Sequence, residues 1–457
     1  MNATTASSAS TSTDGLPTPR RYKAIAALLT AVSMTVLDAG IANLALPTIA
    51  RALDVSAAQS VWIVSAYQLA LVALLLPLAA LSERISLRRV FGAGVCLFSL
   101  ASLGCALAPD LFWLVLARAL QGIGAAAIMC VSAGIVKLTY PKHLLGRGIG
   151  INALCVALGS ALAPSLGAGI LALGGWPWLF AINLPIGLVV LMLLKALPDN
   201  PQAQRRIDPL SVLLNIGLFC CGIGGLERIA VEPLQGVVLL VVAAGCLWGL
   251  LHHERGQAAP LLPVDLIEHP QFRHAIMASI CSFAAQMLCF LAIPFYLQHQ
   301  LGLTPVHVAL LMLSWPLTVA VAAQVAGRLA DHYRPQTLCM LGGLGIALGL
   351  AITAVWPLAE GQGPLVAFMI IGGLGFGFFQ VPNNRIMLTS TPSSRTGATG
   401  GMQATARQTG MALGATALAI LLHLWPESAP RLGLVLASMM GLAAAWASWR
   451  APRIQGS

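Results

Sequence analysis

The chain has 457 residues, of which 58% are hydrophobic and only 9% are charged, and its formal net charge is +10. No water-soluble fold of this length has an interior large enough for so much apolar surface. Nucleic-acid binding requires basic residues that share one soluble face, whereas here they lie in short connectors between apolar runs. The composition therefore indicates a protein that crosses a membrane many times.

The amino-terminal region is expected to be a disordered cytoplasmic tail over residues 1–23, because its first nineteen residues are rich in Ser, Thr and Ala. The apolar run that follows, 24–46, is longer than the apolar region of about 7–15 residues in a signal peptide. We predict a retained membrane span. Asp38 is its one carboxylate, and an acid at this depth costs roughly 2.5–3.5 kcal/mol on insertion scales, which makes it a hypothesis about function.

Fourteen apolar runs of this kind follow one another along the chain, each close to the length that crosses a bilayer. Each is expected to be a helix, because open strands would leave backbone polar groups unpaired in lipid, and an outer-membrane barrel would show short alternating segments instead. We place the runs at 24–46, 60–81, 90–108, 111–136, 148–171, 178–197, 210–227, 234–251, 274–297, 306–326, 337–357, 363–382, 398–422 and 432–449.

The basic residues predict the orientation of these spans. With a cytoplasmic amino terminus, 20 of the 25 Lys and Arg residues lie on inner connectors, three lie on outer connectors, and Arg118 and Arg407 lie within spans. Inner loops of membrane proteins are enriched in Lys and Arg. We therefore expect both termini in the cytoplasm and the protein in the inner (plasma) membrane.

Two polar segments, 198–209 and 252–274, divide the spans into six, two and six. The connector after the second span, ALSERISLRR, has an echo after the tenth, GRLADHYRPQ. Paired six-helix bundles with a central site are a known transporter construction. We expect an amino-terminal bundle, a linker with two inserted helices, a carboxy-terminal bundle and a cytoplasmic tail, at 24–198, 199–272, 273–449 and 450–457.

The carboxylates in these connectors stand next to basic residues, so we predict charge latches between cytoplasmic helix ends. The latch residues are Glu83, Arg84, Arg88, Asp331 and Arg334. Glu227 stands beside Arg228 at the outer end of the seventh span, where we predict an interfacial ion pair.

Arg118 is the natural partner for Asp38. Both lie about eight residues from the outer ends of their spans, which is about 12 Å at helical rise. A pair would lower the cost of burying each charge. Two roles remain open for it: an ion pair that locks two helices, or a carboxylate that takes and releases a proton as the cavity changes sides.

The fifth span contains GSALAPSLGAG, which puts small residues four apart on one helix face beside a proline, namely Gly159, Ala163, Pro164 and Gly167. Small residues at this spacing permit close helix contact, and proline bends helices. Ordinary packing and a gating hinge are both consistent with this pattern.

Other polar and aromatic residues within the spans are candidates for lining a substrate cavity. They are Asn43, Tyr67, Gln68, Gln121, Gln286, Trp315, Phe379, Asn383 and Arg407. Hydrogen bonding between helices and aromatic packing are the alternative roles. No phosphate loop, zinc ligand set or nucleophile triad is present in the sequence, so we expect no cofactor, no metal and no enzymatic activity.

Several motifs resemble those of the major facilitator superfamily, and within it the fourteen-span drug:proton antiporters, from about Ala24 to Trp449. LDAGIANLALP (37–47) resembles the first-helix motif LDxTIVNVALP, ARALQGIGAA the fourth-helix motif, GSALAPSLGAG the antiporter motif and WPWLFAINLPIG (176–187) the signature WRWxFxINxPxG. GRLADHYRP, VPNNR and TARQTG stand at the expected places in the second half. The resemblance puts Asp38 at the position implicated in proton coupling.

The chain also departs from these motifs. Ala39 and Gly40 follow the acid in place of residues that include the usual Thr, and Ala163 stands where Gly is common. Pro177 replaces the arginine of the WRW signature. In the connector after the second span, the usual Gly, Asp and Gly are replaced by Ala79, Glu83 and Ser86.

The resemblance implies an all-helical major facilitator fold and a proton-coupled exporter of small amphipathic compounds, cationic ones included, that works by alternating access. Asp38 would exchange the proton, Arg118 would bias its charge state, and the fifth span would help to reseal the outer gate. The alternatives are a proton-coupled transporter of an amino acid, sugar or organic acid, and a non-transporting sensor or scaffold. The expected partners are a small-molecule substrate, protons and the lipid bilayer, with no nucleic acid, and we expect a monomer.

Overall fold

The structure, a computed structural model, describes residues 15–141, 144–199, 208–229, 231–255, 266, 268–330, 332–356, 363–390 and 396–452. Within these ranges the chain folds into helices and short connectors. In chain order the helices are α1 (Thr18–Ala52), α2 (Ala57–Arg84), α3 (Leu87–Ala106), α4 (Leu111–Thr139), α5 (Leu145–Gly174), α6 (Pro177–Ala181), α7 (Asn183–Leu193), η2 (Leu194–Ala196), α8 (Pro209–Arg228), α9 (Pro233–His253), α11 (Pro270–Pro294), η3 (Phe295–Gln300), α12 (Pro305–Met312), α13 (Ser314–Leu329), α14 (Pro335–Val355), α15 (Gly363–Thr389), α16 (Thr396–Leu424) and α17 (Ala429–Arg450).

The all-helical architecture predicted from the apolar runs is confirmed. Among the described residues, 12 helical segments are long and apolar enough to cross a membrane. Three of these segments join consecutive elements: α6 to η2, α11 with η3, and α12 with α13. The expected count of fourteen is not confirmed by this measure, because α5 and α16 are outside the 12; α5 contributes the shorter apolar helix Leu162–Gly174.

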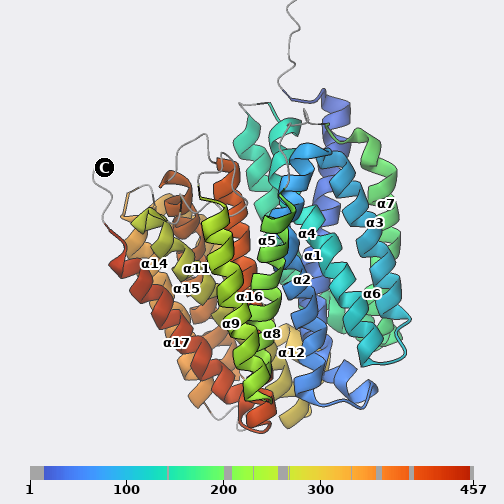
Figure 1. The fold of residues 1–457 in the computed structure, drawn as a ribbon. Coiled ribbons are helices and arrows are strands. Elements are labelled where there is room, and N and C mark those ends of the chain that lie inside the picture. The colour runs from blue at the N-terminus through green and yellow to red at the C-terminus, as the bar shows by residue number, and fades with distance from the viewer. Residues whose placement is uncertain are drawn as a thin grey trace, which may run out of the picture.

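The helices form two groups with an inserted pair between them (Figure 1). Helices α1 to α7 pack on one another, as do α11 to α17, and α2 of the first group packs along α16 of the second. We call the end of the molecule where α1 begins and α17 ends the terminal end, and the opposite one the far end (Figure 1). The boundary between α2 and α16 is called the seam below.

Local sequence signals explain where helices begin at the far end. Ser56 and Gln59 form a capping box at the start of α2: the Ser56 hydroxyl accepts from the Gln59 backbone N–H, and the Gln59 side chain accepts from the Ser56 N–H. Asp110 caps α4 by accepting from the backbone N–H of Trp113. These caps satisfy backbone donors that the first helical turn leaves unpaired.

The inserted helices α8 and α9 lie side by side in front of the seam (Figure 1). Helix α8 contacts both α2 and α16, and α9 packs on α8. Asn215 of α8 donates to the backbone carbonyl of Ala73 in α2 at 2.7 Å. The inserted pair is thus attached to both helix groups by α8.

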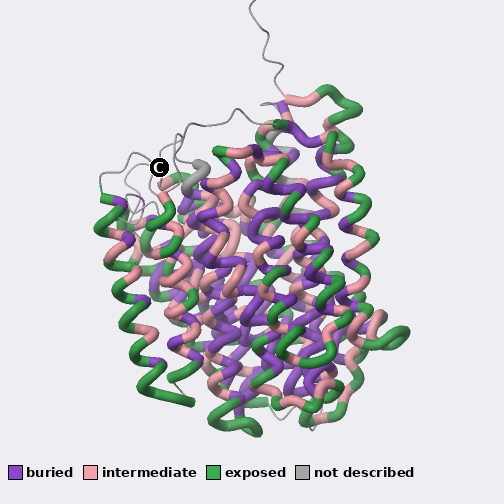
Figure 2. Tube along the Cα trace, turned by 45° about the vertical axis from the view of Figure 1, so that its right-hand side comes forward, coloured by how far each residue is buried: buried purple, intermediate pink, exposed green. Residues whose placement is uncertain are grey.

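The two groups are joined near the far end. Gln298 of η3 donates to the backbone carbonyl of Leu44 in α1 at 2.9 Å, and Thr48 donates to the Gln298 side chain at 3.3 Å. Asn43 donates to the sulfur of Met287 in α11 at 3.8 Å. Buried residues run through the middle of the molecule and exposed ones line its outer helices (Figure 2). The largest apolar cluster accordingly continues from α1 into α11.

Candidate functional site

The sequence brings polar side chains from several helices of the first group to one buried point. Asp38 comes from the middle of α1, Arg118 and Gln121 from α4, and Asn183 from the start of α7. Arg118 and Gln121 are three residues apart, so they share one helix face. All four residues are at most 2% exposed. The predicted depth match between Asp38 and Arg118 therefore corresponds to a direct contact.

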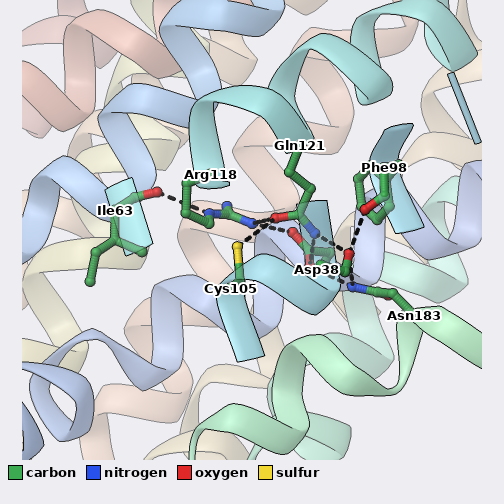
Figure 3. Close-up of polar contacts among 8 residues, drawn as sticks. Asp38, Ile63, Phe98, Cys105, Arg118, Gln121 and Asn183 are labelled. Atoms are coloured by element: carbon green, nitrogen blue, oxygen red, sulfur yellow. Dashed lines mark hydrogen bonds and ion pairs between the residues drawn. The ribbon is translucent and has the colours of Figure 1, made fainter. Parts of the chain in front are cut away.

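The Asp38 carboxylate accepts three hydrogen bonds (Figure 3). Arg118 Nη1 donates to Oδ2 at 2.5 Å. Gln121 Nε2 and Asn183 Nδ2 each donate to Oδ1 at 2.8 Å. A buried carboxylate surrounded by one guanidinium and two amide donors has both its charge and its hydrogen-bonding capacity satisfied. The site is therefore built for an ionised carboxylate.

Arg118 is held by contacts that do not involve Asp38. Its Nε donates to the backbone carbonyl of Ile63 in α2 at 3.0 Å, and Nη1 also donates to Gln121 Oε1 at 2.6 Å. The guanidinium carbon lies 4.3 Å from the centre of the Tyr67 ring and 5.6 Å from that of Phe180, where a cation is attracted to the ring face. Arg118 thus has polar and aromatic contacts of its own in addition to Asp38.

Helix α3 supplies an outer set of contacts that orient the two amides. Ser102 Oγ accepts from Gln121 Nε2 at 2.8 Å and from Asn183 Nδ2 at 3.3 Å, and it donates to the Phe98 carbonyl at 2.7 Å. Cys105 Sγ donates to Gln121 Oε1 at 3.7 Å. These bonds fix which end of each amide faces Asp38, because both amide nitrogens are directed toward acceptors.

Asp38 and Arg118 form a buried ion pair, and its geometry indicates what the loss of one charge would do. Removing one partner from a buried ion pair is strongly destabilising, by about 3–5 kcal/mol, because the other charge is left uncompensated. A proton on the carboxylate has the same electrostatic effect. Gln121 Oε1 and the Ile63 carbonyl are acceptors for Arg118 that do not depend on Asp38, whereas Nη2 is buried without a hydrogen-bond partner among the described residues.

The small-residue face of α5 packs directly on the part of α1 that carries Asp38. Gly159 faces Val36, and Gly167 faces Ile41. Between them Gly40 faces Ala163: a Cβ at residue 40 would lie 2.5 Å from the Ala163 Cβ. Two departures from the family motifs, Gly40 and Ala163, therefore meet at one contact and compensate each other in volume. Pro164, the fourth residue of this motif, is buried inside α5.

The predicted latch residues are only partly placed by the structure. Arg88 forms an ion pair at 3.2 Å with Asp199, three residues after the end of η2, and Ser86 donates to the same carboxylate. Glu83, Arg84 and Arg334 are exposed. Asp331 lies outside the described residues. The first connector thus contacts the carboxyl end of its own helix group.

The candidate cavity residues divide into distinct environments. Tyr67 and Gln121 belong to the Asp38 site. Trp315 and Phe379 are fully buried in the second group, where Trp315 contacts the rings of Phe290 and Phe376. Asn383 donates to Ser279 Oγ at 2.9 Å and to the Ala275 carbonyl at 3.2 Å, and therefore links α15 to α11.

Four further candidates either have a buried polar atom without a hydrogen-bond partner among the described residues or are partly exposed. Asn43 Oδ1 and Gln68 Oε1 are buried without a hydrogen-bond partner within the described structure. Gln286 and Arg407 are half-buried. Arg407 has no acidic partner among the described residues, which makes it different from Arg118.

The predicted ion pair between Glu227 and Arg228 is wrong. Arg228 pairs with Glu232 at 3.7 Å and donates to Gln235 at 2.8 Å. Glu227 points the other way, is 8% exposed, and accepts from Thr416 Oγ1 in α16 at 3.1 Å. Consecutive residues on a helix face directions about 100° apart, so one can be buried while the next is exposed.

Sequence reasoning did not assign Asn183, Ser102 and Cys105 to the Asp38 site. Asn183 was within reach, because it is the asparagine of the WPWLFAINLPIG segment and stands in the middle of an apolar run. Ser102 and Cys105 carry no comparable signal, since small weakly polar residues are common in membrane helices.

The fold and the buried site define a multi-pass membrane transporter, and comparison with known proteins agrees. The chain belongs to the Major Facilitator Superfamily, which matches residues 28–415. The superfamily consists of transporters rather than enzymes. Its members handle small-molecule substrates in the lipid bilayer.

Among relatives, the chain is 39% identical over 444 residues to the uncharacterized transporter YebQ of Escherichia coli (strain K12), covering 95% of this chain and 96% of that one. It is 28% identical over 391 residues to the riboflavin transporter RibZ of Clostridioides difficile (strain 630), covering 84% of each. It is 28% identical over 416 residues to the drug efflux pump JefA of Mycobacterium tuberculosis (strain ATCC 25618 / H37Rv), covering 89% and 82%. A solved bacterial homologue of the human lysosomal transporter Spinster, inward-facing and unoccupied, has a TM-score of 0.70 at 15% identity, covering 95% and 98%, which shows the shared fold.

Proposed function

We propose that this protein is a proton-coupled antiporter that exports small amphipathic, drug-like compounds, cationic ones included, by alternating access. The motif resemblance and the efflux pump among its relatives support this proposal. Two six-helix bundles, 24–198 and 273–449, would rock about a central substrate path. The proton gradient supplies about 1.36 kcal/mol per pH unit and the membrane potential about 2.3 kcal/mol per charge and 100 mV.

The observation that carries the proposal is the enclosed site around Asp38. A purely structural ion pair needs one carboxylate and one cation, whereas here Arg118 also donates to two acceptors other than Asp38, which would hold it when Asp38 is neutral. Protonation of Asp38 would release its three donors and loosen α1 from α4 and α7. In the proposed cycle this loosening accompanies the change of access, and Asp38 gives up its proton on the cytoplasmic side.

The proposed topology has fourteen spans, with α5 and α16 as the two beyond the apolar 12. Both are long enough, at 30 and 29 residues. With both termini in the cytoplasm of the cell and the protein in the inner membrane, the far end faces outward. The bonds of Gln298 to α1 would then close the outer side of a monomeric transporter.

The remaining predicted residues take supporting roles in this proposal. The α5 face of Gly159, Ala163, Pro164 and Gly167 slides on α1 and reseals the outer gate. The connector residues Glu83, Arg84, Arg88, Asp331 and Arg334 latch the cytoplasmic side. The half-buried or unsatisfied side chains of Asn43, Gln68, Gln286 and Arg407 are the candidates for substrate contact.

The test is a matched pair of carboxamide variants in everted membrane vesicles that hold a preformed pH gradient. Ethidium should dissipate the gradient in vesicles with the wild type. Asp38→Asn should abolish this dissipation, and Asp54→Asn, the same change on an exposed connector, should retain it. Proton-linked transport that survives in Asp38→Asn would refute the coupling role. A non-transporting scaffold would give no response from any variant.

A second candidate function is export of an organic anion, and Arg407 favours it. Arg407 lies on α16 between two contacts with other helices. On one side of it Gly410 packs on α11, and on the other side Gln408 donates to the sulfur of Met129 in α4. An arginine without an acidic partner at this position is suited to a carboxylate or phosphate. Arg407→Gln should then abolish export of fluorescein, an anionic dye, while Arg89→Gln, at an exposed position in the first turn of α3, leaves it unchanged. Equal export by Arg407→Gln would remove this candidate.

A further inference from the structure

Helix α8 presents one continuous face to the seam between the two bundles. Asn215, Phe219, Ile223 and Glu227 are spaced four residues apart, which places them on one side of the helix. Asn215 bonds to α2, and Phe219 and Ile223 pack in a small apolar cluster with residues of α2 and α16. Glu227 extends this face toward the far end. The inserted hairpin therefore contributes a carboxyl group to the boundary between the bundles.

The Glu227 carboxyl lies between one hydroxyl from each bundle. Thr416 of α16 donates to Oε1 at 3.1 Å. Ser65 of α2 lies beside the same carboxyl, and neither its hydroxyl oxygen nor Glu227 Oε2 has a partner within hydrogen-bond geometry among the described residues. If Oε2 carries a proton, its O–H can donate to the Ser65 oxygen, which has no other partner among the described residues. The geometry thus leaves an acceptor for a carboxylic acid, and no cation among the described residues pairs with a carboxylate at this point.

Other titratable groups near the seam do not neutralise Glu227. On α8 and the start of α9, Arg228 and Glu232 pair with each other. On α16, His423 lies two turns beyond Thr416 and is exposed, and Arg407 lies on the opposite side of the helix. On α2, Tyr67 faces Arg118. A carboxylate that is buried without a cation is far more costly than the neutral acid.

We propose that Glu227 is a second proton-binding site, contributed by the inserted hairpin, whose proton is taken up when the seam closes at the far end. The inference rests on the alternating access of the proposed function, because only a rearrangement between α2 and α16 exposes the carboxyl to water. In the closed arrangement the acid is neutral and shared between Thr416 and Ser65. In the open arrangement it ionises and returns the proton to the solvent on that side. No covalent step is involved: one O–H bond forms or breaks.

The consequence is a pH-linked closure that does not depend on Asp38. Because closing binds one proton, the ratio of closed to open molecules should rise about tenfold for each unit by which the pH falls through the working range. Glu227→Gln keeps the shape of the side chain and is neutral in both arrangements. Closure of this variant should therefore be independent of pH, and at high pH a larger fraction of its molecules than of the wild type should be closed.

The experiment measures this ratio in the full-length protein in lipid nanodiscs, without substrate and with equal pH on both sides. Spin labels on unnatural amino acids at Ala52 and Leu424, both exposed at the far end, leave the native cysteines in place. The distance distribution should shift toward the short population at low pH in the wild type and in Glu232→Gln, the matched control. In Glu227→Gln it should stay constant, and Glu227→Asp should recover the pH dependence.

Infrared difference spectra between low and high pH give a second readout on the same samples. The C=O stretching band of a protonated carboxyl should be present in the wild type, Asp38→Asn and Glu232→Gln, and one such band should be missing in Glu227→Gln. A wild-type distance distribution that does not change with pH, or an unchanged dependence in Glu227→Gln, would overturn the inference. Failure of the proposed antiport is seen separately, as absence of gradient dissipation in vesicles with the wild type.

Discussion

The contact between Gly40 and Ala163 yields a prediction that follows directly from geometry. We expect Gly40→Ala to destabilise the protein and Ala163→Gly to restore most of the loss. The first change adds a methyl group to α1 at the point where α5 crosses it, two residues after Asp38. The second removes the methyl group that it meets. The pair thus tests whether the two departures from the family motifs compensate each other.

The magnitude follows from the distance between the two carbons. The added Cβ lies 2.5 Å from the Ala163 Cβ, whereas carbon atoms in favourable contact are about 3.5–4.0 Å apart. The helices must separate by about 1 Å, and overpacking of this kind costs about 1–3 kcal/mol. Gly in place of Ala within a helix costs roughly 0.5–1 kcal/mol. Gly40→Ala should therefore lose about 1–3 kcal/mol, and the double variant about 1 kcal/mol or less.

Equilibrium unfolding by dodecyl sulfate in mixed micelles measures these free energies for the wild type, both single variants and the double variant. Gly169→Ala is the control, because a Cβ at this exposed α5 position meets no atom within 4 Å. Antiport in vesicles should fall in Gly40→Ala and recover in the double variant, since displacement of α1 moves Asp38 away from Arg118. Strictly additive losses in the double-mutant cycle would refute the compensation.

Three further outcomes are expected. Asn183→Leu, which removes one donor from the buried carboxylate, should lower the free energy of unfolding by about 1.5–3 kcal/mol in the same micelle titration. Gln298→Ala should speed hydrogen–deuterium exchange in the far-end parts of α1 and η3, whereas Gln300→Ala, whose side chain does not reach α1, should leave it unchanged. Hydrogen bonds from the hydroxyl and backbone at the start of α8 lower the pKa of Asp208 to about 2. The stability that this cap adds over Asp208→Asn should be full above a pH of about 4 and disappear as the pH falls toward 2, as thermal unfolding at stepped pH will show.

The sequence was sufficient for features that depend on depth and periodicity. Asp38 and Arg118 are paired because the number of residues to the end of each span gives their depths in the membrane, and the two depths agree. Depth follows directly from position along a membrane helix. The small face of α5 was visible as a period of four. These arguments use position along one helix, and they need no knowledge of how two helices are rotated against each other.

Rotation is what the sequence could not supply. Glu227 was assigned to Arg228 because the two are neighbours in the chain, although the period of four through Asn215, Phe219 and Ile223 already placed Glu227 on a shared face. Gln298 gave no signal that it would reach Leu44, since that contact joins residues 254 apart. Contacts between bundles depend on the arrangement of whole helices. A glutamine can make many different contacts of this kind, so its presence in the sequence does not identify the partner.

In the two proposals above, one fold accommodates two buried carboxyl groups in opposite charge states. Asp38 is surrounded by N–H donors and a cation from its own bundle, so its ionised form is compatible with a closed and dry site. Among the described residues, the polar groups beside the Glu227 carboxyl are hydroxyls, one from each bundle, so its neutral form suits burial and its charged form requires water. The first site therefore responds to the packing within one bundle and the second to the distance between bundles. A cycle that loosens α1 and then opens the seam would change the two protonation states in sequence, which separates the coupling step from the closing step.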